Sequence, residues 1–176
     1  MTALARAFYR MKPLEPPDSF HLNAAQGWVG LGDYAAANDE LEQIAEVNSA
    51  HPDFLQVRWH IHARAGQWDT CLDIATALTA KTPERSSGWI RHAYTLHQLG
   101  WTQEAKDLLL FALNAFGSNV TIPYHLARYC CRLGQVTEAE QWLGKALLVA
   151  ADMEEVERLS KLALEDPALE PVRKMP

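Results

Sequence analysis

The chain has 176 residues, of which 48% are hydrophobic, and carries a formal net charge of −6 at pH 7. This length and apolar content suffice for one domain with a sizeable core, and the sparse glycines and prolines exclude widespread disorder. No apolar run approaches the roughly 18–20 residues of a membrane span, and the arginines are too few and too mixed with acids to form a nucleic-acid-binding stripe.

The N-terminal segment Met1–Lys12 is basic, but it lacks an uninterrupted apolar stretch and a small-residue cleavage site, so we predict no signal peptide. Its apolar side chains at helical spacing leave two possibilities open, a frayed arm or a docked helix. The linker Pro13–Pro17 follows. We therefore assign residues 1–17 to an N-terminal arm and a proline-rich linker.

A repeat occupies most of the remaining chain. Glycines recur at an interval of 34 residues, at Gly32, Gly66, Gly100 and Gly134. An interval of about 34 residues is the length of one helix–turn–helix unit in a stacked array, and such arrays bind other proteins rather than perform chemistry. Alignment on the glycines defines four units, residues 18–51, 52–85, 86–119 and 120–153.

Each unit reads as two amphipathic helices joined at its glycine, where a positive φ ends the first helix. Five positions after each glycine stands a small residue, which we expect where two helices cross closely: Ala37, Cys71, Ala105 and Ala139. Apolar residues follow it along the second helix, in the first unit Leu41 and Ile44. Pro52 and Pro83 lie at unit junctions, where proline can begin a helix but cannot continue one.

The segment after Asp152 predicts one more helix. Val156, Leu159, Leu162 and Ala163 form an apolar stripe, while charged residues face away. A polar-backed helix of this kind caps the open end of a repeat array. Asp166-Pro167 is expected to stop the helix, and residues 168–176 are expected to lie extended, so residues 154–176 are assigned to a capping helix and a tail.

These units resemble the tetratricopeptide repeat (TPR) family, whose pattern has a large residue, then Leu-Gly or Leu-Ala, an aromatic residue, a turn glycine and a small alanine. The third unit matches best and the second is the most divergent, with Trp59 where a small residue is usual. The third unit carries Trp89, Ala93, Leu96, Leu99-Gly100, Ala105, Leu109 and Ala112. The resemblance spans residues 18–153 and implies an all-α fold, a right-handed α-solenoid of helix–turn–helix repeats with a C-terminal capping helix.

Charge is distributed unevenly between the two helices of the units. The four first-helix segments carry five arginines against Asp18 and Asp53, a net +3, whereas the second-helix segments carry thirteen acids against four bases, a net −9. In the TPR fold the first helices line a concave face and the second helices a convex one. The resemblance therefore implies a relatively basic groove, which concentrates its field on acidic ligands. The alternative, that some arginines pair with acids inside the stack, stays open, above all for Arg58 and Arg91.

The groove positions of the family carry over residue by residue. Arginine offers bidentate contacts to carboxylates and tyrosine offers rigid contact area, a mixture that suits an extended or helical peptide with acidic and apolar residues. The partner-binding residues predicted in this way are Gln26, Gln56, His60, Arg64, Tyr94, His97, Gln98, Tyr124, Arg128 and Arg132; Leu22, Ile90 and Cys131 occupy further groove positions. The carboxylate clamp of one TPR subtype is rejected, because only Arg91 of its five matching positions fits.

Catalytic, metal and cofactor sites are not predicted. His60 and His62 face different directions on one helix, no His-Glu-x-x-His motif is present, and no phosphate-binding loop or Ser/His/Asp arrangement stands out. Three cysteines, two of them adjacent, make no disulfide framework and fit a reducing cytoplasm. Cys71 and Cys130 are expected to be buried, while the exposure of Cys131 is left open.

The sequence therefore predicts a cytoplasmic, non-enzymatic all-α adaptor that needs no cofactor and holds a protein or peptide partner in its groove. No nucleic acid or membrane partner is expected, and the oligomeric state is left open. The alternative is a dedicated secretion or assembly chaperone, because the chain resembles the TPR chaperones of type III secretion in size, acidity and N-terminal segment.

Overall fold

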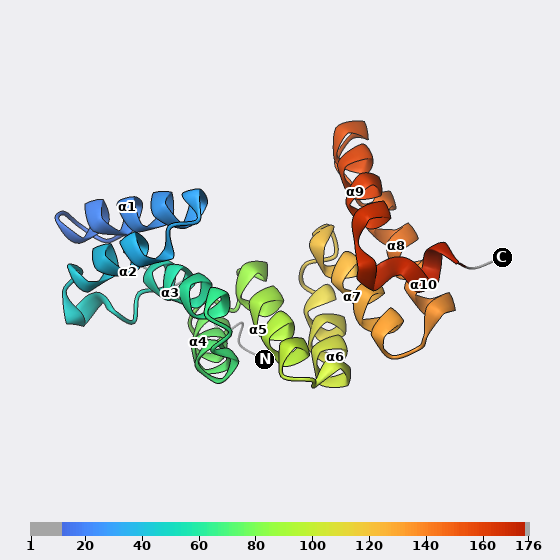
Figure 1. The fold of residues 1–176 in the computed structure, drawn as a ribbon, viewed down its shortest axis with the longest axis horizontal. Helices are drawn as coiled ribbons and strands as arrows, with labels where there is room; N and C mark the ends of the chain where they lie inside the picture. The colour runs from blue at the N-terminus through green and yellow to red at the C-terminus, as the bar shows by residue number, and fades with distance from the viewer. Residues whose placement is uncertain (1–11, 175–176) are drawn as a thin grey trace, which may run out of the picture. The chain divides into compact units, whose positions relative to one another are not determined.

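A computed structural model describes residues 12–174, and within this range the chain folds into α-helices and short 3-10 helices without any strand (Figure 1). The predicted arm Met1–Lys12 lies outside the described residues except for Lys12. The helices are α1 (Asp18–Leu31), α2 (Tyr34–Glu42), η1 (Glu46–Asn48), α3 (Pro52–Arg64), α4 (Trp68–Lys81), α5 (Ser86–Gln98), α6 (Thr102–Leu113), α7 (Thr121–Arg132), α8 (Val136–Leu148), α9 (Met153–Glu165), η2 (Pro167–Leu169) and α10 (Glu170–Arg173).

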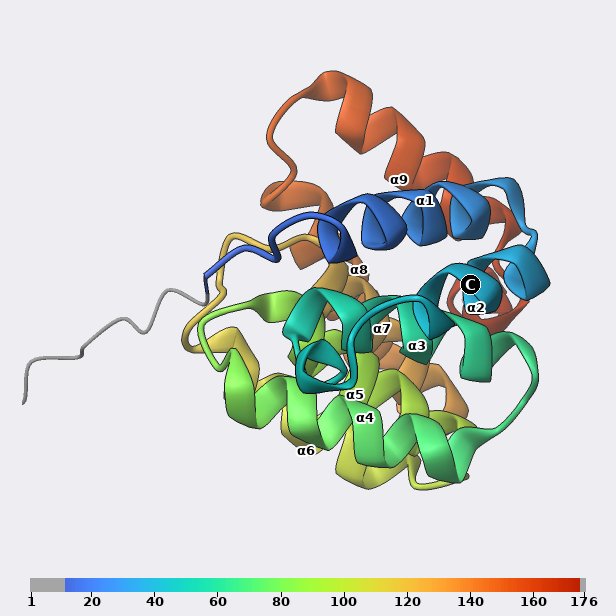
Figure 2. The ribbon, with the colours of Figure 1, turned by 90° about the vertical axis from the view of Figure 1, so that its left-hand side faces the viewer.

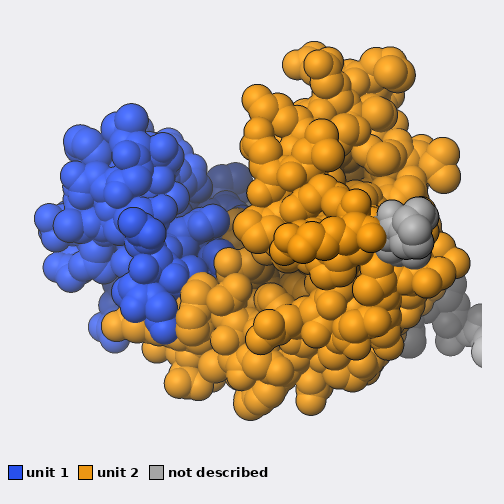
Figure 3. Space-filling model, turned by 45° about the vertical axis from the view of Figure 1, so that its right-hand side comes forward, with its two compact units in different colours: residues 1–66 blue, residues 67–176 orange. Residues whose placement is uncertain are grey.

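The helices form two compact units, residues 1–66 and residues 67–176 (Figure 3). The boundary divides the second repeat, so that α3 belongs to the first unit and α4 to the second.

The glycines of the repeat end their helices as predicted. Gly32, Gly66, Gly100 and Gly134 have φ values of 80°, 70°, 88° and 77°, and they are the described residues with positive φ. After Gly100, the backbone N–H of Trp101 donates to the carbonyl oxygen of Leu96 at 2.9 Å, which closes the end of α5. The predicted positive φ at the turn of each repeat is therefore confirmed.

The small residues of the repeat are buried in the helical packing. Ala37, Cys71, Ala105 and Ala139 are all fully buried, with 0% of their surface exposed. Since a larger side chain would hold two helix axes apart, small residues at these positions allow the closest approach. Their complete burial agrees with the prediction that they stand at close crossings.

The first repeat, residues 18–51, departs from the repeat pattern in its second helix, which ends at Glu42. Ile44 is buried as expected, but it lies beyond the helix rather than on it. The carboxylate of Asp18, itself buried, accepts hydrogen bonds from the backbone N–H of Ala45 at 3.2 Å and from the side chain of Asn48 at 2.7 Å. These bonds hold the chain between α2 and α3, which contains the short 3-10 helix η1, away from the path that a longer α2 would take.

The second unit arranges its repeat helices in two layers. Helix α5 packs on α6 and α7 packs on α8, and α5 and α6 lie alongside each other in two views (Figures 1 and 2). Ring contacts join α5 to α7, whereas the ammonium of Lys106 on α6 lies 2.7 Å from the carboxylate of Glu138 on α8. First helices thus neighbour first helices, and second helices neighbour second helices.

The apolar core of this unit follows the same plan. One cluster fills the space between α5, α6 and α7 around Leu109, Ile122 and Leu126, which are 0% exposed. A second cluster lies between α7, α8 and the C-terminal helices, around Ala127, Cys130 and Leu169. Helix α7 therefore contributes to both clusters and is the centre of the second unit.

The C-terminal region matches the prediction in its helix and differs in its tail. Helix α9 forms and ends before Asp166-Pro167 as expected, with Leu159 and Ala163 buried, but Leu162 is 47% exposed and does not belong to the buried stripe. The expected extended tail is wrong. Asp166 accepts a hydrogen bond from the backbone N–H of Ala168 at 2.9 Å and begins η2, which leads directly into α10.

Candidate functional site

The predicted partner-binding residues of the first unit lie on α1 and α3. Gln26 and Arg64 are exposed, while Gln56 and His60 are half-buried. Gln56 Nε2 lies 3.4 Å from Asp53 Oδ1, and the His60 ring meets the edge of Trp59 at 5.3 Å between centroids. All four residues belong to the compact unit of residues 1–66.

In the second unit, the predicted residues come together on two neighbouring helices. Tyr94, His97 and Gln98 lie on α5, whereas Tyr124, Arg128 and Arg132 lie on α7. Gln98 and Arg132 are exposed, and Tyr94 and His97 are half-buried. We call the surface formed by Tyr94, His97, Gln98, His125, Arg128 and Arg132 the α5–α7 face.

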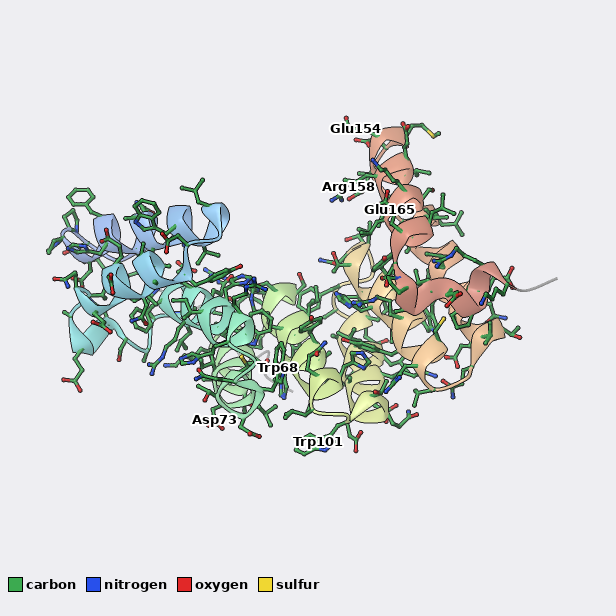
Figure 4. The ribbon with its side chains drawn as sticks, viewed as in Figure 1. Trp68, Asp73, Trp101, Glu154, Arg158 and Glu165 are labelled. Carbon is green, nitrogen blue, oxygen red and sulfur yellow. The ribbon has the colours of Figure 1, made fainter. Side chains whose placement is uncertain are left out.

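Aromatic rings hold the α5–α7 face together. His97 and Tyr129 approach to 4.8 Å between ring centroids, and Tyr94 and His125 meet at 6.2 Å. The series continues to α4 through Trp68, which lies beside α5 and contacts Tyr94 at 5.9 Å (Figure 4). Because each ring is fixed by its neighbours, the face presents its polar atoms from a rigid base.

Sequence reasoning missed two of these rings, His125 and Tyr129. Neither stands at a groove position carried over from the family, but they are four residues apart on α7 and therefore share one face of the helix. That spacing was the available signal. Tyr129 is 0% exposed, and among the described residues its hydroxyl has no hydrogen-bond partner.

Burial and arginine charges keep the histidines of the face neutral. Burial lowers the pKa of His97, and Arg128 and Arg132 lower it further. Burial, and then the charge of Arg128, lower the pKa of His125 to about 4, although Asp166 opposes the shift. At neutral pH the positive charge of the face therefore resides on its arginines.

The C-terminal segment covers part of the face. The hydroxyl of Tyr124 donates to Oδ2 of Asp166 at 2.9 Å. Arg128 Nε lies 2.9 Å from the same oxygen, within ion-pair distance but outside hydrogen-bond geometry. Tyr124, which the sequence predicts as a partner contact, is only 6% exposed and is covered by the chain's own C-terminal segment. The reason is that the tail folds back onto α7, which the local sequence pattern does not encode.

All three cysteines are buried. This confirms the expectation for Cys71 and Cys130 and answers the open question on Cys131. Burial raises the pKa of Cys71 and of Cys130 to about 11, and it raises the pKa of Cys131 against a backbone hydrogen bond from Val172. A thiol with such a pKa carries little thiolate at pH 7 and is a poor nucleophile.

Residues 12–174 hold no group of three or more His, Cys, Asp or Glu side chains arranged to bind a metal ion. Within the same residues, none of the helices has both the length and the apolar character that crossing a membrane requires.

Comparison with known proteins identifies the fold. No protein-family profile matches the chain, and no curated protein matches it in sequence. Among solved structures, TTC0263, a thermophilic TPR protein of Thermus thermophilus, is similar with a TM-score of 0.71 at 20% identity, over 88% of this chain and 86% of that chain.

Two type III secretion proteins are similar over a smaller part of this chain. The Yersinia enterocolitica chaperone SycD, solved with a peptide of the translocator YopD, gives a TM-score of 0.61 at 19% identity, over 73% of this chain and 97% of SycD. PcrH from Pseudomonas aeruginosa gives 0.61 at 22% identity, over 74% of this chain and 95% of PcrH. The chain therefore has the tetratricopeptide repeat fold that its glycine-marked units predicted.

Proposed function

We propose that this protein is an interaction adaptor that binds a peptide or partner helix with acidic and apolar residues on the α5–α7 face. The observation that carries the proposal is the charge of the two helices: α5 and α7 contain no acidic residue, and Arg128 and Arg132 of α7 lie on the face. Carboxylates of a partner meet arginines there, and its apolar side chains meet rigid aromatic rings.

The second helices favour the same choice of face. Helices α6 and α8 each carry two acids against one lysine, and Lys106 is already paired with Glu138. An acidic partner is therefore repelled by this layer and attracted by the arginines of α5 and α7. We place the predicted residues of the first unit, Gln26, Gln56, His60 and Arg64, among the partner contacts on the family resemblance alone.

We further propose that the protein is not an enzyme and acts in the cytoplasm. Its thiols are buried with raised pKa values, which disfavours a cysteine nucleophile. Three cysteines without a disulfide suit a reducing compartment.

The second candidate function is a dedicated secretion or assembly chaperone. Its support is the similarity to SycD, whose structure contains a translocator peptide. A dedicated chaperone co-purifies one abundant client and dimerises through its N-terminal segment, whereas an adaptor recovers several partners at low stoichiometry. A pull-down with mass spectrometry, combined with the measured molecular mass of the pure protein, distinguishes the two.

The adaptor proposal is tested by titrating the partner recovered in the pull-down against two variants of the face. Arg132→Glu reverses an exposed charge, so we expect association to slow by about threefold or more and the loss to shrink as salt rises. Tyr94→Ala removes a rigid ring and is expected to cost about 1–2 kcal/mol of binding free energy with less dependence on salt.

Each variant has a matched control on the second-helix layer. Lys145→Glu makes the same charge change on the exposed surface of α8, and Phe111→Ala removes a ring that is 66% exposed on α6. Both controls are expected to leave binding unchanged. If the controls weaken binding while Arg132→Glu and Tyr94→Ala do not, the partner uses the other face and the proposal is wrong.

A further inference from the structure

The C-terminal segment Asp166–Arg173 lies on α7 at positions that the family resemblance assigns to partner binding. Asp166 contacts Tyr124 and Arg128 through one carboxylate oxygen, as described above. Cys131, the next groove position along α7, is only 8% exposed, and the backbone N–H of Val172 lies against its thiol. Of the fourth-repeat groove residues, Arg132 alone remains exposed.

We propose that Asp166 takes the place of a carboxylate of an acidic partner peptide, so that the segment Asp166–Arg173 competes with this partner for Tyr124 and Arg128. The inference rests on the proposed function and adds a regulation to it. In the closed state the segment blocks part of the face, and an acidic partner binds fully only when the segment is displaced.

The contacts of Asp166 are those that an external carboxylate would make. A tyrosine hydroxyl donates to the carboxylate and a guanidinium lies beside it, and only 11% of the Asp166 side chain and 23% of the Arg128 side chain are exposed. Hydrogen bonds to a charged group in such a setting are stronger than bonds between neutral groups. The site therefore recognises a carboxylate, and the chain supplies one itself.

The segment is built so that it can be released. Its helices are short, since η2 has three residues and α10 has four, and the one described side chain of the segment that is fully buried is Leu169. Arg173 fastens the segment to the end of α9 by donating to the carbonyl oxygens of Ala163 and Asp166, at 2.7 and 2.8 Å. These two bonds stay within the C-terminal region, so they do not oppose its departure from α7.

The closed segment has the advantage of being tethered. A group on the same chain acts at an effective concentration of the order of millimolar, so a free partner binds only if its affinity and concentration together outweigh those of the tethered segment. Arg132, which the segment leaves exposed, offers an acidic peptide a first contact beside the covered positions. The apparent affinity for the partner then scales with the fraction of molecules in which the segment is open.

Cys131 reports on the opening. The test measures its alkylation by iodoacetamide, followed by mass spectrometry, in the full-length protein and in Asp166→Asn, which keeps the side-chain oxygen that caps Ala168 and removes the charge. Loss of a charge-assisted hydrogen bond is expected to raise the alkylation rate of Cys131 about tenfold. Because the charge of Asp166 also raises the pKa of Cys131, Tyr124→Phe, which breaks the same bond and keeps that charge, must raise the rate as well. Cys71 and Cys130, both 0% exposed, serve as internal controls for global unfolding.

The matched control is Glu165→Gln, which neutralises the neighbouring exposed acid at the end of α9 (Figure 4). We expect it to leave the alkylation of Cys131 unchanged. If Asp166→Asn and Glu165→Gln give the same rate, or if all three cysteines react together, Asp166 does not hold the segment closed and the proposal is overturned.

The competition itself is tested with a defined probe, a fluorescein-labelled peptide of residues 163–174. The peptide is expected to bind Asp166→Asn about tenfold more tightly than the unaltered protein, because the internal competitor is weakened. Binding should weaken by about tenfold when the aspartate of the peptide is replaced by asparagine, and likewise when Tyr124→Phe is combined with Asp166→Asn. Equal binding to both proteins, or no binding to Asp166→Asn, overturns the competition.

The partner recovered in the pull-down separates this inference from the proposed function. If both are correct, Asp166→Asn strengthens partner binding while Arg132→Glu weakens it. If Arg132→Glu weakens binding and Asp166→Asn leaves it unchanged, the proposed function holds and the competition is wrong. If neither variant changes partner binding, both fail.

Discussion

Two glycines of the second unit provide a direct test of why glycine recurs along this chain. Gly134 follows α7 with a φ of 77°, whereas Gly144 lies inside α8 with ordinary helical geometry. A Cβ atom added at either position meets no other atom within 4 Å. Replacement by alanine therefore clashes with no neighbouring element at either site, and any difference in stability comes from the strain that a positive φ imposes on an L side chain through its own backbone.

The two substitutions are expected to move stability in opposite directions. A left-handed conformation costs an L-residue about 1–2 kcal/mol, so Gly134→Ala should lower the free energy of unfolding by about that amount. Alanine is favoured over glycine inside a helix by roughly 0.5–1 kcal/mol, so Gly144→Ala should raise it. The pair should differ by about 2 kcal/mol.

The assay is urea unfolding followed by far-UV circular dichroism, with both variants compared at one protein concentration. The dependence of the unfolding free energy on urea concentration should be the same for both variants, while their midpoint urea concentrations should lie on opposite sides of the midpoint of the unaltered protein. Gly100→Ala, whose φ is 88° at the same turn of the third repeat, should repeat the loss seen with Gly134→Ala. Equal midpoints for Gly134→Ala and Gly144→Ala would refute the assignment of these glycines to helix ends.

Two further predictions concern charged and titrating groups of the second unit. The side chain of Lys106 is 7% exposed and lies 2.7 Å from Glu138, so it joins α6 to α8. Lys106→Met should therefore lower the free energy of unfolding, measured by chemical denaturation, by about 1 kcal/mol. Lys145→Met, on the exposed surface of α8, should leave it unchanged. An unchanged midpoint for Lys106→Met would show that the pair contributes nothing to stability. The pKa of His125, which faces Arg128, Asp166 and His97, lies at about 4 in the folded protein and near 6.5 in the unfolded chain, so the unfolded chain binds one more proton between these values. The contribution of neutral His125 to the free energy of unfolding is then fully present above pH 6.5, and it falls by roughly 1 kcal/mol per pH unit on acidification toward pH 4. In unfolding measured at several pH values, His125→Gln should reduce this dependence of the free energy on pH. The same dependence in both proteins would contradict the prediction.

The local sequence predicted the repeat helices, their turns and their closest crossings. These features depend on a residue's own backbone preference or on the side of its helix. The repeat glycines adopt a positive φ after their helices, Ala105 is small enough to lie where there is little room, and Asp166-Pro167 cannot continue α9. Such preferences act over a few residues, so the sequence pattern displays them directly.

The candidate site was predicted only in part, because its surroundings come from other elements. Tyr94, His97 and Arg132 follow from their positions on the first helices, which the period of the repeat defines. The rings of His125 and Tyr129 became part of the site only when α5 and α7 were packed together. The composition of α7 alone does not reveal which of its residues α5 contacts.

The tertiary structure decided every feature that depends on a distant partner. Asp18 shapes the chain after α2 through a bond to a residue 27 positions away, Lys106 meets Glu138 across 32 positions, and Tyr124 meets Asp166 across 42 positions. A hydrogen bond of this kind exists only after the helices have packed, and its energy then outweighs the local preference for a longer helix, an unpaired lysine or an extended tail. The helical repeat was thus written in the sequence pattern, while the covering of Tyr124 and Arg128 was set by packing.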